Sequence, residues 1–341
     1  MAEERFLLVR LGSLGDVVFT LPALAALRDT FPGARIDWVI DRRWQALLDG
    51  NPDLTNAIPL NDRSAVTFLA CARTLRATRY SCAIDIQGLY KSAFLARLSG
   101  APRRIGFTST FVREAGAAMF YTQRVAPREP HMVGQNIELA IAAGARPSKL
   151  RFPLRVSPAA RKLVDELVLR TGWDRYAVLS PGGGWRSKCW PPERFGAVAT
   201  MLWERHGLRS FVNGGPGESS RAQVVVKSAG AAAPAAVELG LAQLMALLQR
   251  AAIVVAADSG PLHLAVALGA PVVGLYGPTS PARNGPYSPA DVVIRNASSA
   301  ETTYKRRDAY SSPMLSITVD QVVAGIERRL NLASAGVSLP H

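Results

Sequence analysis

The feature that most constrains this chain is an alternation of short apolar runs with helical patterns, which starts twice. In the first half, RFLLVRL is followed by VVFTLPALAALRDTF, ARIDWVI, a helical stretch near residues 43–50, CAIDIQ, LYKSAFLARLSG and RRIGF. Residues 145–160 then hold three prolines, and the alternation resumes with YAVLSPGGG. Such a pattern predicts parallel sheets covered by helices on both faces. We therefore expect an α/β protein with two doubly wound, Rossmann-like domains.

The second half has the same rhythm. Its strand-like runs are LRSFVNGG, AAVEL, AAIVVAADSG and APVVGLYG, and its expected helices are 192–206, 218–229, 241–250 and 261–268. A length of 341 residues exceeds one ordinary core, in agreement with two domains. We place these domains at 1–155 and 156–315, followed by a C-terminal helix and tail at 316–341 that is loose after residue 333.

The chain is strongly basic, with 40 Lys and Arg against 26 Asp and Glu and a net charge of +14. A basic protein favours polyanionic partners such as nucleic acid, an anionic membrane or a phosphorylated substrate. Seven of the basic residues and only two acidic ones fall within residues 88–130. No Lys/Arg block typical of nucleic-acid-binding arms is present, so no nucleic acid is expected.

The cellular location is expected to be cytoplasmic. The three cysteines are scattered, the N-terminus does not resemble a signal peptide, and no run approaches the roughly 20 apolar residues of a membrane-spanning helix. The basic charge suits contact with an anionic membrane face.

A glycine turn follows the first apolar run, in LLVRLGSLGDVVFTLP. Its strand–turn–helix order is similar to a dinucleotide-binding fingerprint, and Asp41 stands about where that fingerprint has a ribose-binding acid. However, the three-glycine spacing is absent, and Asp16 would repel a pyrophosphate at the turn. Asp16 is therefore either a helix cap or a general base. The helix dipole would lower its pKa, so burial would have to oppose that effect.

The sequence LSPGGGWRSKCWPPERF, residues 179–195, places three glycines and Lys188 between an apolar run and a helix. Glycines let backbone N–H groups approach a diphosphate, and a lysine neutralises its charge. The alternative is an ordinary glycine turn with a surface lysine.

The sequence VVAADSGPLHLAVALGAPVVGLYGPT, residues 254–279, is the most specific of the candidate segments. Asp258 ends a strand, and Ser259 and Gly260 open a helix whose free N–H groups suit an anion. His263 lies in the first turn, although a lone helical histidine is more often structural. A fourth segment, NGGPGESSRA, contains Glu218, which could bond a ribose or simply begin a helix.

These segments resemble glycosyltransferase family 9, the lipopolysaccharide heptosyltransferases. The resemblance rests on RLGSLGDVVFTLPALAALRDTFPGARIDWV, DIQGLYKSAFLARLSGAPRRIGF, PGGGWRSKCWPPERF, GGPGE and DSGPLHLAVALGAPVVGLYGPTSPARNGPY, in that order. It covers nearly the whole chain, and DIQGLYKSA is more similar to heptosyltransferase I than to heptosyltransferase II. The resemblance implies a GT-B fold, in which two Rossmann-like domains face each other across a cleft.

The resemblance also implies residue roles. Asp16 matches the proposed catalytic base. The positions that match donor contacts are Gly183, Gly184, Lys188, Glu218, Leu239, Asp258, Ser259, Gly260 and His263. Among these, Lys188 would bind the diphosphate and Leu239 would pack on adenine. Gly183 and Gly184 stand where relatives often have threonines, so no hydroxyl contact is expected there.

Acceptor-binding residues are expected on the N-terminal domain, and the candidates are Gly15, Lys91, Arg103 and Arg104. The three cations follow CAIDIQ, whose carboxyl end we expect to open toward the site. Lipid A and Kdo carry phosphates and carboxylates that such cations would bind. The alternative is a solvated basic face.

The resemblance implies an inverting transfer of heptose from ADP-L-glycero-β-D-manno-heptose to the Kdo of lipid A, at the inner face of the bacterial inner membrane. No cofactor and no metal are expected, because the chain contains no D-x-D carboxylate pair. One alternative is a family 9 transferase of heptosyltransferase II type or for another sugar. Two alternatives from other classes are an NAD-dependent oxidoreductase and a non-catalytic basic protein that binds RNA or membrane.

Overall fold

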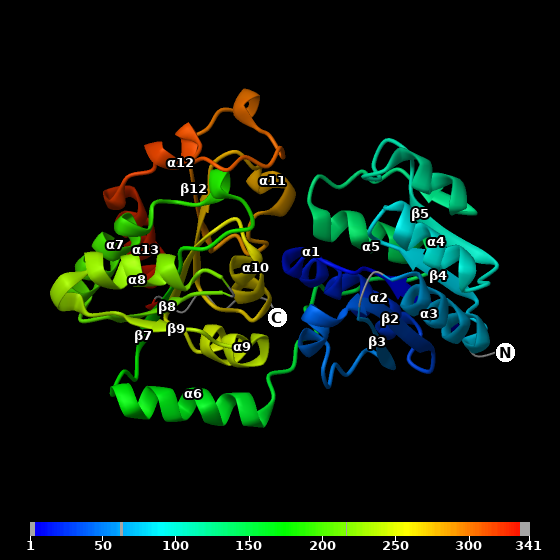
Figure 1. Ribbon diagram of the computed structural model, residues 1–341, viewed down its shortest axis with the longest axis horizontal. Helices are drawn as coiled ribbons and strands as arrows, with labels where there is room; N and C mark the ends of the chain where they lie inside the picture. Colours follow the sequence, from blue (N-terminus) through cyan, green and yellow to red (C-terminus); the bar gives the residue numbers. More distant parts are fainter. Residues whose placement is uncertain (1–3, 62–63, 216, 335–341) are drawn as a thin grey trace. The chain divides into compact units, whose positions relative to one another are not determined.

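The computed structural model describes residues 4–61, 64–215 and 217–334. The chain divides into two compact units, unit 1 up to Arg155 and unit 2 from Val156 onward (Figure 1). Each unit contains a parallel six-stranded sheet. The two units are described separately below.

Unit 1 is built around the strands β1 (Arg5–Val9), β2 (Arg35–Asp41), β3 (Asn56–Leu60), β4 (Cys82–Asp85), β5 (Arg103–Phe107) and β6 (Gln123–Val125). Its helices are α1 (Leu14–Val18), α2 (Leu21–Thr30), α3 (Ala65–Thr78), α4 (Tyr90–Leu98) and α5 (Met132–Ala142), with the 3-10 turns η1 (Arg42–Leu47) and η2 (Ala115–Phe120). The strand order is β3-β2-β1-β4-β5-β6. The helix expected near residues 43–50 is the 3-10 turn η1.

Helices cover both faces of this sheet. On one face, α4 packs against β1 and α3 packs against β3 and α4, in a buried cluster that includes Leu7, Val9, Leu75 and Leu95. The helices α2 and α5 pack against each other. Four of the five β1 residues are buried, as expected for a parallel strand covered on both faces.

Unit 2 contains the strands β7 (Tyr176–Ser180), β8 (Arg209–Asn213), β9 (Ala235–Val237), β10 (Ile253–Ala257), β11 (Val272–Tyr276) and β12 (Val292–Arg295). Its helices are α6 (Pro158–Thr171), α7 (Pro192–His206), α8 (Ser219–Ser228), α9 (Leu241–Gln249), α10 (Gly260–Ala267), α11 (Pro281–Asn284), α12 (Ser312–Ser316) and α13 (Val319–Ser334), with the 3-10 turns η3 (Arg186–Lys188), η4 (Gly230–Ala232) and η5 (Ser299–Glu301). The strand order is β12-β11-β10-β7-β8-β9.

All strands of each sheet are parallel, but the order in which the chain adds them reverses at the centre of the sheet. This reversal lies between β1 and β4 in unit 1 and between β10 and β7 in unit 2. In doubly wound sheets, ligands bind beyond the carboxyl ends of the strands at this reversal. The predicted fold class, two Rossmann-like doubly wound domains, is therefore confirmed.

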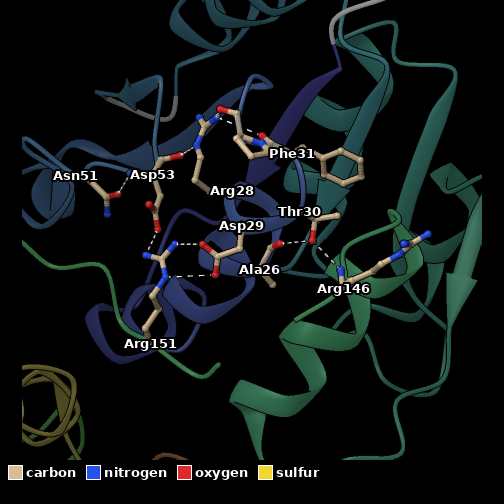
Figure 2. A network of polar contacts seen from close by, with 10 residues as sticks. Ala26, Arg28, Asp29, Thr30, Phe31, Asn51, Asp53, Arg146 and Arg151 are labelled. Carbon is tan, nitrogen blue, oxygen red and sulfur yellow. Dashed lines mark hydrogen bonds and ion pairs between the residues drawn. The ribbon is translucent and has the colours of Figure 1, made fainter. Parts of the chain in front are cut away.

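Polar contacts attach the segment that leads out of unit 1, residues 145–155, to the rest of that unit (Figure 2). Arg151 forms ion pairs with Asp29 at 2.5 Å and with Asp53. The amide of Asn51 donates a hydrogen bond of 2.6 Å to a backbone carbonyl of the same segment. The connecting segment is thus held against α2 and the turn before β3.

The C-terminal helix α13 belongs to the core of unit 2, because its residues Val322, Val323 and Ile326 are buried in the same cluster as α7 and β12. The loose tail expected after residue 333 lies, beyond Ser334, outside the described residues. No helix in the described part of the chain combines the length and the apolar character that crossing a bilayer requires.

Candidate active site

Asp16 lies beyond the carboxyl end of β1, at the reversal of the unit 1 sheet. It is the third residue of α1, whose N-cap is Ser13. Its carboxylate accepts hydrogen bonds from the backbone N–H of Ser13 at 3.0 Å and from the Ser13 hydroxyl at 3.1 Å. Asp16 therefore contributes to the helix cap from inside the first turn, rather than as the N-cap residue.

Arg10 is the main partner of Asp16. Its Nη2 lies 2.8 Å from Asp16 Oδ2, and its Nη1 donates to the carbonyl of Ile86 at 2.5 Å. The side chain of Arg10 is only 7% exposed, whereas that of Asp16 is 35% exposed. Gln87 accepts a hydrogen bond of 2.6 Å from the N–H of Leu11. The loops after β1 and β4 are thus joined around one carboxylate that solvent can reach.

The pKa of Asp16 is set by opposing effects. Burial raises it, but the charge of Arg10 and the hydrogen bonds from Ser13 and Arg10 outweigh burial and lower the pKa from its ordinary value. Asp16 is therefore ionised at neutral pH and able to accept a proton. Burial acts in the expected direction but does not prevail, so Asp16 is a weaker base than a carboxylate with a raised pKa would be.

Asp85 holds the loop that follows β4, which contains Ile86 and Gln87. It is fully buried at the end of β4 and accepts hydrogen bonds from Tyr121 at 2.6 Å, Ser92 at 2.9 Å and the N–H of Gln87 at 2.9 Å. Burial raises the pKa of Asp85, and these hydrogen bonds oppose that rise. Asp85 thereby fixes the loop whose carbonyl holds Arg10.

The four predicted acceptor residues do not all lie near Asp16. Gly15 precedes it in α1, and Lys91 lies in the first turn of α4, which follows the carboxyl end of β4. Arg103 and Arg104 instead begin β5, where they lie beside Cys82 and Ala83 at the amino end of β4.

The expected placement of Arg103 and Arg104 at the carboxyl edge is therefore wrong, because the amino ends of parallel strands form the opposite edge of the sheet. Their guanidinium groups bond backbone carbonyls of unit 1, Arg103 that of Ala142 at 3.0 Å and Arg104 that of Phe120 at 2.9 Å.

Unit 2 has a second polar group at the corresponding reversal, which we call the Asp258 group: Lys188, Asp258, His263 and Asn284. Asp258 follows β10 and is 1% exposed. Its carboxylate lies 2.6 Å from Lys188 Nζ and 3.1 Å from His263 Nε2, and accepts a hydrogen bond of 2.6 Å from the amide of Asn284. Residues from η3, α10 and α11 are thus gathered on one buried carboxylate.

Burial raises the pKa of Asp258, but the hydrogen bond from His263 and the charge of Lys188 prevail and hold the pKa well below its usual range. The carboxylate is therefore ionised and can only accept hydrogen bonds. It follows that His263 Nε2 carries a hydrogen. Lys188 Nζ also lies over the ring of Trp185, at 4.7 Å from the ring centroid.

The start of α10 lies next to the Asp258 group. Ser259 is the N-cap of this helix, and its buried hydroxyl has no hydrogen-bond partner among the described residues. Gly260 and Leu262 contribute N–H groups to the first turn, which have no partner within the helix. Hydroxyl, N–H groups and lysine together form a site suited to an anion.

Glu218 lies against the glycine loop that follows β7. Its carboxylate accepts a hydrogen bond of 3.1 Å from the N–H of Gly183. A Cβ at Gly182 would lie 1.9 Å from Glu218 Oε2, so only glycine permits this approach, whereas Gly184 has open space around it. Leu239 is half-buried in the loop after β9. All the predicted donor residues therefore follow the carboxyl ends of strands in unit 2.

Comparison with known proteins identifies the family. Residues 68–312 match the profile of glycosyltransferase family 9 (heptosyltransferase). The chain is 32% identical over 303 residues to lipopolysaccharide heptosyltransferase 1 of Pseudomonas aeruginosa, with 85% of this chain and 83% of that protein covered. The chain belongs to glycosyltransferase family 9. This family 9 chain is thus a glycosyltransferase of the heptosyltransferase type that acts in lipopolysaccharide core synthesis, and the oxidoreductase and non-catalytic alternatives are not supported.

Solved structures agree with this family 9 assignment. A family 9 glycosyltransferase from Veillonella parvula superposes with a TM-score of 0.85 at 25% identity, with 96% of this chain and 97% of that chain covered. The E. coli heptosyltransferase WaaC with ADP gives a TM-score of 0.77 at 27% identity, over 95% of this chain and 99% of that one. The GT-B assignment of the two Rossmann-like domains is thereby confirmed.

Proposed function

We propose that this enzyme transfers heptose from ADP-L-glycero-β-D-manno-heptose to the Kdo of lipid A with inversion of configuration. The observation that carries the donor assignment is the Asp258 group at the start of α10, in a chain similar to a heptosyltransferase solved with ADP. Similarity to heptosyltransferase 1 supports the acceptor. An E. coli heptosyltransferase 3 is 24% identical over 337 residues, so other acceptors belong in the test.

In this proposal, unit 2 binds the donor. Lys188 has three N–H donors and its ion pair with Asp258 needs only one, so the ammonium can also donate to diphosphate oxygens. The Ser259 hydroxyl and the first N–H groups of α10 would bind the same diphosphate and stabilise charge on the departing ADP. Glu218 would accept hydrogen bonds from the ribose, and Leu239 would pack on adenine.

Unit 1 supplies the base. The ionised carboxylate of Asp16 would take the proton from an acceptor hydroxyl as that oxygen attacks the anomeric carbon. The bond to ADP breaks on the opposite face, and a single displacement inverts the configuration. Arg10 is a positioning residue in this scheme, because it holds Asp16 and keeps it ionised.

A transfer assay tests the proposal. Purified enzyme is incubated with ADP-heptose and either Kdo-lipid A or Kdo-lipid A that already carries one heptose, with UDP-glucose and ADP-glucose as alternative donors. Transfer from ADP-heptose to Kdo-lipid A alone is expected. Preferred transfer to the heptosylated acceptor, or from another donor, would replace the assignment by the alternative that the product identifies.

The pH dependence of transfer should depend on Arg10. Because the pKa of Asp16 is lowered in the folded enzyme, kcat/KM should decline only below about pH 4, the ordinary range of an aspartate. Arg10→Met removes a cation that lowers this pKa, so the acid limb should move to higher pH. Arg43→Met is the matched control, because Arg43 pairs with Asp41 at the exposed end of β2. An acid limb at the same pH in both variants would contradict this role of Arg10.

Transfer is expected to survive an excess of chelator. The chain has no D-x-D pair to hold a metal-bound nucleotide, and the proposed site neutralises the diphosphate with Lys188 and helix N–H groups. Initial rates are compared with and without EDTA, after dialysis of enzyme and substrates against the chelator. Complete loss of transfer that magnesium or manganese restores would refute a metal-free mechanism.

A further inference from the structure

We propose that one face of unit 1 docks the protein on an anionic lipid bilayer. This docking face consists of exposed apolar side chains on α3, α4, η2 and the loop before η2: Val66, Leu69, Tyr90, Phe94, Phe111 and Met119. The proposal deepens the proposed function and rests on it for one point, namely that the acceptor is a membrane glycolipid.

The apolar side chains are concentrated on these elements. Six of the thirteen large apolar side chains that are exposed in the described residues fall within the docking face, including Val66 at 79%, Met119 at 71% and Leu69 at 50% exposed. Single exposed apolar residues are ordinary, but a group of them on adjoining elements marks an interaction surface.

The elements of the docking face are packed together. The ring of Phe68 in α3 stacks on the ring of Phe94 in α4, with 6.0 Å between the ring centroids. The Phe94 ring also contacts the ring of Phe120 in η2, with 5.8 Å between their centroids. The backbone of Gly116 in η2 lies against the Tyr90 ring, since a Cβ there would be 2.0 Å from its hydroxyl. The helices α3 and α4 are direct neighbours in Figure 1. The elements α3, α4 and η2, which carry five of the six side chains, therefore form one packed layer.

The same elements carry a positive charge. Their sequences over 65–78, 90–98 and 110–120 contain five cations and one acid: Arg73, Arg76, Lys91, Arg97, Arg113 and Glu114. The carboxylate of Glu114 accepts a hydrogen bond of 2.6 Å from the backbone N–H of Tyr90. Apolar side chains among cations are typical of surfaces that lie on anionic membranes.

The positive charge of the docking face also favours a bilayer over a second copy of the chain as its partner. A symmetric dimer through this face would bring two sets of five cations together, and like charges across an interface disfavour association. Anionic lipid headgroups complement the cations, while the acyl region accepts the apolar side chains.

The docking face adjoins the loop that supports Asp16. The helix α4 begins at Tyr90, directly after the loop that carries Ile86 and Gln87, and those residues bond Arg10 and Leu11. A bilayer bound at this face would therefore present lipid headgroups on the side of unit 1 where α4 begins.

Vesicle flotation tests the proposal with the intact protein. The variant Val66→Ser/Leu69→Ser/Met119→Ser should lose roughly tenfold or more of its partitioning onto phosphatidylglycerol–phosphatidylethanolamine vesicles. The matched control Leu163→Ser/Leu169→Ser/Leu315→Ser changes residues of unit 2 that are 50%, 84% and 43% exposed, and should bind as the wild type does. Arg73→Gln/Arg97→Gln should weaken binding at low salt, with a smaller effect at high salt.

Equal binding by the triple variant and its control would overturn the proposal, and so would equal binding of the wild type to phosphatidylcholine vesicles. A wild-type dimer that the triple variant abolishes would assign the face to a second copy and also overturn it. A transfer assay with an acceptor that lacks acyl chains distinguishes failure of the proposed function from failure of the docking proposal. If the wild type transfers no heptose in this assay but binds vesicles as expected, the proposed function fails and the docking face still stands.

Discussion

Asp16→Asn is expected to lower kcat by roughly a hundredfold or more, the usual loss when a general base is removed. The carboxylate is ionised, partly exposed and held by Arg10 at 2.8 Å, whereas an asparagine amide in its place cannot accept the acceptor proton. Transfer is measured with saturating ADP-heptose, and ADP affinity by calorimetry should remain nearly unchanged, because the Asp258 group lies in unit 2.

A matched variant separates catalysis from helix capping. Ser13→Ala removes the hydroxyl that donates to Asp16 but keeps the carboxylate and its ion pair with Arg10. This variant should lower the melting temperature slightly and retain most of its activity. Asp16→Asn should also lower the melting temperature, since buried Arg10 loses its ionic partner. If Asp16→Asn lowers the melting temperature but barely changes kcat, Asp16 is a structural cap and another group is the base.

Lys188→Ala should weaken ADP binding by about tenfold or more and lower kcat/KM at least as much. The lysine contributes charge-assisted hydrogen bonds to the bound diphosphate and to the leaving group, each worth about 1.5–3 kcal/mol. Binding is measured by calorimetry and transfer by initial rates. Lys305→Ala is the control, because Lys305 is an exposed lysine of the same unit. Unchanged ADP affinity in Lys188→Ala would remove the lysine from the donor site.

The same variant should show a pH-dependent loss of stability. Asp258 has a lowered pKa in the folded state, so its ionised form stabilises the fold above about pH 4 and this contribution is lost as pH falls. Lys188 is one cause of that lowering. The melting temperature of Lys188→Ala should therefore drop most near neutral pH, and its difference from the wild type should shrink in acid.

Local patterns predict the central strands and the helices that directly follow them. The helix expected at 192–206 is α7 (Pro192–His206), and that expected at 261–268 is α10 (Gly260–Ala267). A buried parallel strand is a continuous apolar run, and a proline or a capping residue marks the start of the next helix, so both signals are contiguous in the chain.

The edges of the unit 1 sheet lack such signals. The alternation predicts neither β3, whose sequence NAIPL contains a proline, nor β6, which has three residues. Edge strands are exposed on one side and need less apolar sequence, so their pairing depends on the neighbouring strand. The alternation also does not predict the helices α3 and α5, because each follows an edge strand rather than a long buried apolar run.

By itself, the sequence determined the two doubly wound domains and the residues at their strand ends, because these features depend on residues that are adjacent in the chain. Only the tertiary structure decided which of those residues meet. Arg10 is buried against Asp16, and Asn284 reaches Asp258 across 26 positions of sequence. The same topology sends Arg103 and Arg104 to the opposite edge of the sheet. Partners in an ion pair are chosen by strand order and loop packing, which no single segment encodes.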